Sequence, residues 1–221
     1  MPKGSPELTA KRKNEIKDAC AAVYQEQGFC GVNIKEISTA VSMTRPAIYH
    51  YFETKEEILL GLLVREYEEW LAELKKADLS VSGTRLAELK KADLSASHTR
   101  TEIIEMIASS LENREIMLRI LNMNLMEIEI NSRVDRLAEF KGWYKAEADC
   151  MKTMLRFCRP DISDAECEIF SRNLDAFLIG LYPFIHHTDK QIEAMMLAGV
   201  EHKKISVYDA VVEFLERVIP V

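Results

Sequence analysis

The sequence predicts an all-α protein, and three observations support that prediction. Glycine and proline are scarce, with 8 and 6 residues in a chain of 221. Apolar residues recur at three- and four-residue spacing almost throughout, and no stretch alternates as a half-buried strand would. A Ser, Thr or Asn repeatedly stands three residues ahead of an acid or amide, as at helix starts. We expect a small three-helix head at 1–54 and a larger helical body at 55–221.

The capping residues place the helices along the chain. Thr9 is expected to cap the first helix and Gly28 to stop it. Strong capping pairs open later helices after Asn33, Thr54, Thr99, Ser163 and Thr188, and weaker ones after Ser132 and Ser206. The expected helices are 10–27, 34–41, 45–51, 55–77, 85–93, 100–112, 114–130, 133–158, 164–186, 189–199 and 207–218.

The first three of these helices carry apolar stripes that can close one small core. The longest stripe repeats at i, i+3, i+4, i+7 and i+8, and shorter ones follow in the next two helices. Their members are Ile16, Ala19, Cys20, Val23 and Tyr24, then Ile34, Ile37 and Val41, then Ile48 and Phe52. Ser42 and Met43 make the turn before the third helix, and Thr44 is its expected N-cap.

The side of the third helix that faces away from this core carries groups suited to DNA. Arg45 can read guanine through a bidentate pair, and Pro46 and Ala47 can meet thymine methyl groups. Tyr49 and His50 can reach phosphates. The alternative for Tyr49 and Tyr51 is that both are only core aromatics. This short helix is therefore the candidate element for reading the major groove.

The charge distribution agrees with a head that grips phosphates. Residues 9–52 hold six basic and four acidic groups, although the whole chain has a net charge of −7. Lys35 projects from the start of the second helix, and Lys55 stands at the start of the fourth. We expect both lysines to contact phosphate, together with the capping residue Thr44.

Nothing in the composition points to a membrane or an oxidising compartment. No run approaches the roughly 18 apolar residues of a membrane span, and residues 1–15 lack the apolar core of a secretory signal. We therefore expect a cytoplasmic protein. The five cysteines form no CxxC pair, so buried, reduced thiols are expected. A redox switch among Cys150, Cys158 and Cys167 is the alternative.

The segment 9–60, and most closely IKEISTAVSMTRPAIYHYFETKEEIL, resembles the N-terminal DNA-binding domain of the TetR (tetracycline repressor) family of bacterial regulators. The pattern is carried by Gly28-Phe29, Ile34, Ile37, Ile48-Tyr49-His50-Tyr51-Phe52 and Lys55-Glu56-Glu57-Ile58. The resemblance implies an all-α homodimer with a helix-turn-helix head and a ligand-binding and dimerisation body. It also implies a palindromic operator that matches the two-fold axis of the dimer.

Two residues depart from the family pattern. Ser42 occupies the turn position where the family usually has glycine, so Ser42 is expected to adopt a positive φ. Pro46 replaces a residue that is often glycine or another small residue, and it stiffens the reading helix. The base preference of relatives therefore does not transfer to this chain.

The body contains a single tandem duplication. Residues 71–85 and 86–100 match at thirteen of fifteen positions. Two copies are too few to build a solenoid, and the Ser-rich stretch 80–84 should interrupt a continuous helix. We expect an extra short helix or loop. It is either a tolerated surface insertion or a change in the segment that transmits movement between head and body.

The rest of the body is rich in methionine, aromatic and aliphatic residues. A hydrophobic ligand pocket is expected around Met117, Leu121, Trp143, Phe177 and Tyr182. The expected helices 164–186 and 207–218 are apolar over a wide arc, so each must pack against neighbours on several sides. By the resemblance they form a dimer interface through Leu174, Leu178, Leu181, Val211, Phe214 and Leu215, and intrachain core is the alternative.

We interpret the chain as a transcriptional regulator, a repressor released from double-stranded DNA by a small hydrophobic effector. Ligand in the body would move the helix at 55–77 and spoil the fit to half-sites about 34 Å apart. The alternative is a helical adaptor that has lost specific DNA binding, which Ser42 and the acidic balance favour. No catalytic motif occurs, and the spacing of Glu127, Glu129, His186 and His187 matches no metal signature. We therefore expect that the chain is not an enzyme and binds no cofactor or metal ion.

Overall fold

The computed structural model describes residues 5–80 and 96–219, and every regular element in these ranges is an α-helix. The all-α prediction is confirmed. The chain forms two compact units, which are described separately: unit 1 is Met1–Glu66 with Met123–Trp143, and unit 2 is Tyr67–Asn122 with Tyr144–Val221. Within the described ranges, no helix has both the length and the apolar character needed to cross a bilayer.

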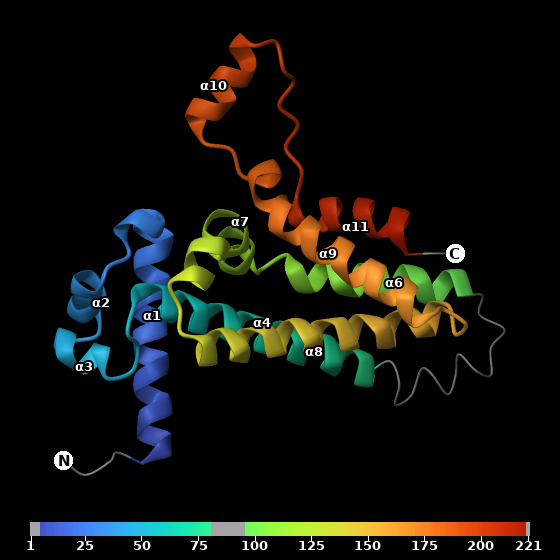
Figure 1. Cartoon of the computed structure of the whole chain (residues 1–221). Helices are drawn as coiled ribbons and strands as arrows, with labels where there is room; N and C mark the ends of the chain where they lie inside the picture. Colours follow the sequence, from blue (N-terminus) through green and yellow to red (C-terminus); the bar gives the residue numbers. More distant parts are fainter. Residues whose placement is uncertain (1–4, 81–95, 220–221) are drawn as a thin grey trace. The chain divides into compact units, whose positions relative to one another are not determined.

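Unit 1 begins with α1, Pro6–Gly31, which starts earlier than expected (Figure 1). Ser5 rather than Thr9 is its N-cap, because the Ser5 hydroxyl accepts the Leu8 N–H at 3.2 Å and Pro6 suits the first helical position. The expected stop at Gly28 marks a real break. Gly28 leaves the helical conformation with φ 67° and ψ −172°, and the helix resumes for three more residues.

The helices α2, Ile34–Ala40, and α3, Arg45–Tyr49, complete the head as the apolar stripes predicted. All five members of the α1 stripe are buried. Ile37 and Ile48 are fully buried and Phe52 is 4% exposed, so the three stripes close one core. Asn33 caps α2 by accepting the Glu36 N–H at 2.9 Å.

Three longer helices contribute to both units: α4, Lys55–Ser80; α7, Glu115–Ile130; and α8, Val134–Cys158. Residues 55–66 therefore belong to the compact head unit, which differs from the boundary expected at residue 54. Helix α4 also continues three residues beyond its expected end at 77. The expected helix at 85–93 lies outside the described residues.

The corner between α7 and α8 joins unit 1 through a buried carboxylate. Glu57 of α4 is 1% exposed, and its two carboxylate oxygens accept the Arg133 Nε–H at 2.6 Å and an Nη2–H at 3.0 Å. The Arg133 backbone N–H also donates to this carboxylate at 3.3 Å. The Thr54 hydroxyl adds a hydrogen bond to the Asn131 carbonyl at 3.1 Å. The sequence did not predict that this corner packs with the head.

Unit 2 also contains α6, Ala96–Leu111; α9, Asp164–Ile185; α10, Asp189–Leu197; and α11, Val207–Val218. The expected capping boxes at Ser163 and Thr188 are present. Helices α6 and α11 pack together, and Arg100 of α6 donates to the Ile219 carbonyl at 3.1 Å. Trp70 is fully buried and donates its indole N–H to the Ser110 hydroxyl at 2.8 Å. Helix α10 stands away from α9 and α11 on its connecting segments (Figure 1).

All five cysteines are free thiols, as expected. Cys20, Cys158 and Cys167 are buried and Cys150 is half-buried, but Cys30 is exposed. Burial raises the pKa of Cys20 to about 12 and that of Cys158 to about 11, which suppresses thiolate formation. The expectation of burial is thus wrong for Cys30.

Replacing Glu57 by Gln should destabilise unit 1 by about 1–3 kcal/mol at neutral pH, because Arg133 loses a charge-assisted, bidentate acceptor. Burial opposes ionisation of Glu57, but hydrogen bonds from Arg133 and the Glu53 backbone outweigh it and hold the Glu57 pKa below its ordinary value. A carboxylate with a lowered pKa stabilises the fold above its unfolded pKa and ceases to do so on acidification. The difference between wild type and variant should therefore shrink as the pH falls below 4.5, the ordinary value.

Denaturant unfolding between neutral and acidic pH measures this difference. Glu53→Gln is the matched control, because the Glu53 carboxylate also pairs with Arg133, at 2.9 Å, but is 58% exposed. Equal stabilities of the two variants at neutral pH would contradict the role given to Glu57.

Candidate nucleic-acid interface

The turn between α2 and α3 sets the position of α3. Ser42 adopts φ 54°, the positive value expected from its place in the turn. The Met43 N–H donates to the Ser38 carbonyl at 3.2 Å, which closes the turn on α2. The Thr44 hydroxyl then accepts the Ala47 N–H at 3.4 Å as the N-cap of α3. The local sequence thus starts a new helix at Arg45, three residues after the left-handed Ser42.

Helix α3 buries one side and exposes the other. Ile48 is fully buried, whereas Tyr49 is 52% exposed. Arg45, Pro46 and His50 are also exposed. The exposed fraction of Tyr49 disagrees with the alternative that its ring is simply a core aromatic.

The remaining predicted contact residues of this surface fall into two groups. Lys35 is exposed at the start of α2, and Thr44 is exposed although its hydroxyl serves as the cap. Ala47 is half-buried. Among residues 5–80 and 96–219, no carboxylate lies within 4.0 Å of Lys35 or Arg45 to neutralise them. We call Lys35, Thr44, Arg45, Pro46, Ala47, Tyr49 and His50 the reading surface.

Lys55 is held inside unit 1 rather than extended from it. Its ammonium lies 3.4 Å from the Phe29 carbonyl oxygen and 4.0 Å from the centroid of the Phe29 ring. This contact ties the start of α4 to the last turn of α1, where the Phe29 carbonyl also accepts the Val32 N–H at 3.2 Å. The structure thus gives Lys55 an intrachain contact, and the phosphate contact expected from the sequence stays a prediction.

The five residues expected to line a ligand pocket do not share one cavity among the described residues. Met117 and Leu121 are at most 1% exposed, and Trp143 belongs to unit 1. Tyr182 stacks on His186 with ring centroids 4.6 Å apart. Phe177 alone of the five lines the open groove of about 760 Å³ in unit 2.

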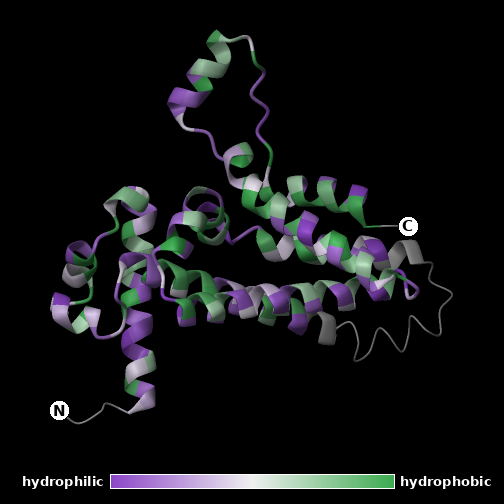
Figure 2. Cartoon of the chain, in the orientation of Figure 1, coloured by the Kyte–Doolittle hydropathy of each residue, from purple (hydrophilic) through white to green (hydrophobic). Residues whose placement is uncertain are grey.

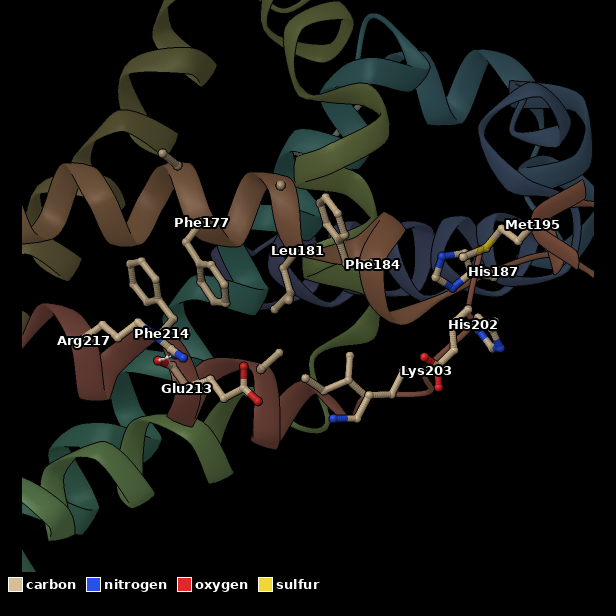
Figure 3. Close-up of a pocket in the computed structure, with 15 residues that line it drawn as sticks. Phe177, Leu181, Phe184, His187, Met195, His202, Lys203, Glu213, Phe214 and Arg217 are labelled. Carbon is tan, nitrogen blue, oxygen red and sulfur yellow. Dashed lines mark hydrogen bonds between the residues drawn. The ribbon is translucent and has the colours of Figure 1, made fainter. Parts of the chain in front are cut away.

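That groove lies between α9 and the segment that carries α10 and leads into α11 (Figure 3). Phe177 and Phe214 stack in it with ring centroids 4.1 Å apart. Phe184, His187 and Met195 line its other end. The groove was not anticipated, because its walls come from helices whose apolar arcs look alike in sequence.

Most residues expected in a dimer interface are buried within the single chain. Leu174, Leu178, Leu181, Val211 and Leu215 are at most 3% exposed, and Phe214 is half-buried. The intrachain alternative therefore describes the observed packing of these side chains. The apolar surface left open in this part of unit 2 includes Phe184, Met196 and Leu197, which are 71%, 66% and 84% exposed.

Comparisons with known proteins agree with a regulator of two parts. The family described as "Bacterial regulatory proteins, tetR family" matches residues 16–62, and "Tetracyclin repressor-like, C-terminal domain" matches residues 64–219. The HTH-type transcriptional repressor Rv1474c of Mycobacterium tuberculosis is 28% identical over 79 residues, which cover 36% of this chain and 42% of that protein. The HTH-type repressor AcnR of Corynebacterium diphtheriae is 31% identical over 74 residues, 34% of this chain and 38% of that protein. The chain thus spans about two-fifths of the length of these relatives.

Solved structures share the fold over nearly the whole chain. The regulator FadR from Bacillus subtilis in complex with stearoyl-CoA has a TM-score of 0.56 at 14% identity, covering 93% of this chain and 97% of that one. A regulator from Saccharomonospora viridis in complex with choline has a TM-score of 0.57 at 15% identity, covering 95% and 96%. At these identities the likeness concerns the fold.

Replacing Ser42 by Gly should stabilise the head by up to about 1 kcal/mol, because glycine removes the steric cost of a left-handed residue, offset in part by its freedom in the unfolded chain. Thermal unfolding followed by circular dichroism measures the change. Ser38→Gly, inside the regular helix α2, is the control and should instead lower stability. A loss of stability in Ser42→Gly would contradict the strain inferred from φ.

Proposed function

The chain belongs to the TetR family of bacterial regulators, and from that membership we propose that it is a sequence-specific DNA-binding repressor released from its operator by a small ligand. The observation that carries the proposal is the reading surface, where α3 exposes Arg45 and Tyr49 while Ile48 fixes its other side in the core. The matching relatives are transcriptional repressors, which supports DNA binding over the adaptor alternative.

The reading surface suggests how each group acts on a duplex. Helix α3 enters the major groove, where the Arg45 guanidinium donates two hydrogen bonds to guanine O6 and N7. The Tyr49 hydroxyl donates to a phosphate beside the groove, and Lys35 contributes an electrostatic phosphate contact. Because Lys55 is engaged by Phe29, its part is to hold α1 and α4 together under the reading surface.

The ligand response is proposed to act through the helices that run through both units. Similar structures include regulators in complex with stearoyl-CoA and with choline, which supports a ligand-binding role for unit 2. Helices α7 and α8 lead from the Arg133 corner into unit 2, and α4 does so from Glu57. A ligand that favours a different arrangement of these helices would bias the reading surface toward release.

We also propose a homodimer that binds a palindromic operator, with α10 contributing to the contact between the two copies. Helix α10 has nine residues and none of them is buried, yet an isolated helix of that length is marginal in water. Figure 2 shows hydrophobic colour on part of α10 as well as on parts of α9 and α11. Two copies related by a two-fold axis would cover Met196 and Leu197 and present two reading surfaces to half-sites about 34 Å apart.

Substituting Arg45 or Tyr49 by Ala should weaken operator binding by about 1–3 kcal/mol, and Arg45→Ala should also relax the preference at one base pair. Fluorescence anisotropy with a duplex from the region upstream of the gene for this protein measures both effects. The matched control is Arg217→Ala, an exposed arginine of α11. If Arg45→Ala binds the duplex as Arg217→Ala does, the assignment of the reading surface is wrong.

The double substitution Met196→Asp with Leu197→Asp should weaken self-association by about tenfold or more, because charge is placed at the proposed centre of an apolar contact. Light scattering after size-exclusion chromatography reports the mass over a dilution series. Leu8→Asp, an exposed apolar position of α1, is the control. A wild-type chain that remains monomeric, or a variant that dimerises equally well, would contradict the role of α10.

A further inference from the structure

A carboxylate lies inside unit 2 without a hydrogen-bond partner among the described residues. Glu147 of α8 is 0% exposed, and neither of its carboxylate oxygens receives a hydrogen bond from any described residue. No described Lys, Arg or His lies within 4.0 Å of its carboxylate. Removal of a carboxylate from water is unfavourable unless a cation or hydrogen-bond donors take the place of the solvent.

Two other buried polar side chains in this protein are satisfied. Glu57 receives the Arg133 guanidinium, and Ser110 receives the Trp70 indole N–H. Glu147 lies on the same face of α8 as Tyr144, Met151 and Met154, at helical spacing. An apolar residue such as leucine would fill this buried position without the cost of burying a charge. A carboxylate at such a position needs a reason other than packing.

The surroundings of Glu147 are acidic and aromatic. Asp175 of α9 and Tyr67 of α4 interact electrostatically with it. The Tyr67 ring lies 5.6 Å from that of Tyr144 and 5.9 Å from that of Trp70, measured between centroids. Carboxylates and the faces of aromatic rings both attract cations. The groups that converge here from α4, α8 and α9 are thus complementary to a positive charge.

The buried face of α8 beyond Glu147 carries flexible apolar side chains. Met151 is fully buried and Met154 is 3% exposed, one and two turns beyond Glu147. Methionine is unbranched and flexible, so it adapts to an inserted group at low cost. A ligand with a charged end at Glu147 would therefore direct its apolar part along these methionines.

We propose that Glu147 anchors the ammonium group of an amphiphilic amine, a primary or secondary amine on an apolar body, inside unit 2. This proposal rests on the proposed ligand response and names the chemical class of the effector. The ammonium N–H groups supply the hydrogen bonds that no described residue gives to the two Glu147 oxygens, and Tyr67, Tyr144 and Asp175 lie around the charge. The effector thus carries a cationic group on the apolar body that the sequence led us to expect.

Proton release accompanies binding. Burial, and to a lesser extent the Asp175 carboxylate, raise the pKa of Glu147 to about 9, so the free protein holds it protonated at neutral pH. An incoming ammonium pairs with the ionised form, and the Glu147 proton leaves to solvent. Affinity for a cationic ligand should consequently rise about tenfold for each pH unit between 6 and 8, while affinity for a neutral ligand stays constant.

The test uses 4-phenylbutylammonium and its neutral isostere pentylbenzene on the full-length protein, in which only the ammonium and methyl ends differ. Isothermal titration calorimetry in buffers of different ionisation enthalpy gives the affinity and the number of protons released. The variant Glu147→Gln keeps the size of the side chain and removes its charge. Asp149→Asn removes a carboxylate from the exposed side of the same helix as the control.

We expect the ammonium to bind wild type and Asp149→Asn alike, with release of up to one proton, and to bind Glu147→Gln about thirtyfold or more weakly. Pentylbenzene should not distinguish the three proteins. Equal binding of the ammonium to Glu147→Gln, or no preference of wild type for it over pentylbenzene, overturns the proposal. Glu147-dependent binding that leaves a bound duplex in place supports the site and overturns the proposed ligand response instead.

Discussion

The bidentate pair between Glu57 and Arg133 is the interaction on which the organisation of unit 1 depends. It joins the start of α4 to a corner that lies 76 residues further along the chain. The pair satisfies a carboxylate that would otherwise be buried alone, and the planar guanidinium fixes the direction from which α8 departs. The Glu57 carboxylate also accepts the Glu53 N–H at 2.8 Å, so it fixes the five-residue link between α3 and α4.

Local patterns predicted what depends on neighbours in sequence. The i, i+3, i+4 stripes identified Ile16, Ile37 and Ile48 as core, and the family pattern anticipated the positive φ of Ser42, because helix periodicity and turn geometry are local properties. Residue type alone could not identify the partner of a long side chain. The sequence did not predict the contact of the Lys55 ammonium with the Phe29 carbonyl, and Arg133 carried no signal of its own.

The wide apolar arcs of α9 and α11 show a second limit of sequence reasoning. A wide apolar arc indicates that a helix packs against neighbours on several sides, but it does not indicate whether those neighbours belong to the same chain or to a second copy. Leu174 and Val211 turned out to be covered within unit 2, whereas Met196 and Leu197 of α10 are open. Side chains that a protein leaves open at the end of a projecting segment are better candidates for a contact between copies than side chains that already fill its core.

The contrast between Glu57 and Glu147 separates structure from recognition in this fold. Both are glutamates on helices and both are at most 1% exposed. Hydrogen bonds hold the pKa of Glu57 below its ordinary value, so it stays ionised and its pair is permanent at neutral pH. Burial raises the pKa of Glu147, so its charge is absent until a partner compensates it. The permanent Glu57–Arg133 pair fixes two segments of one chain, whereas a carboxyl group that ionises only when a cation binds suits a reversibly bound ligand. The cost of burying a carboxylate is thus offset at Glu57 by Arg133 of the same chain and, as we propose, at Glu147 by the ammonium group of the ligand.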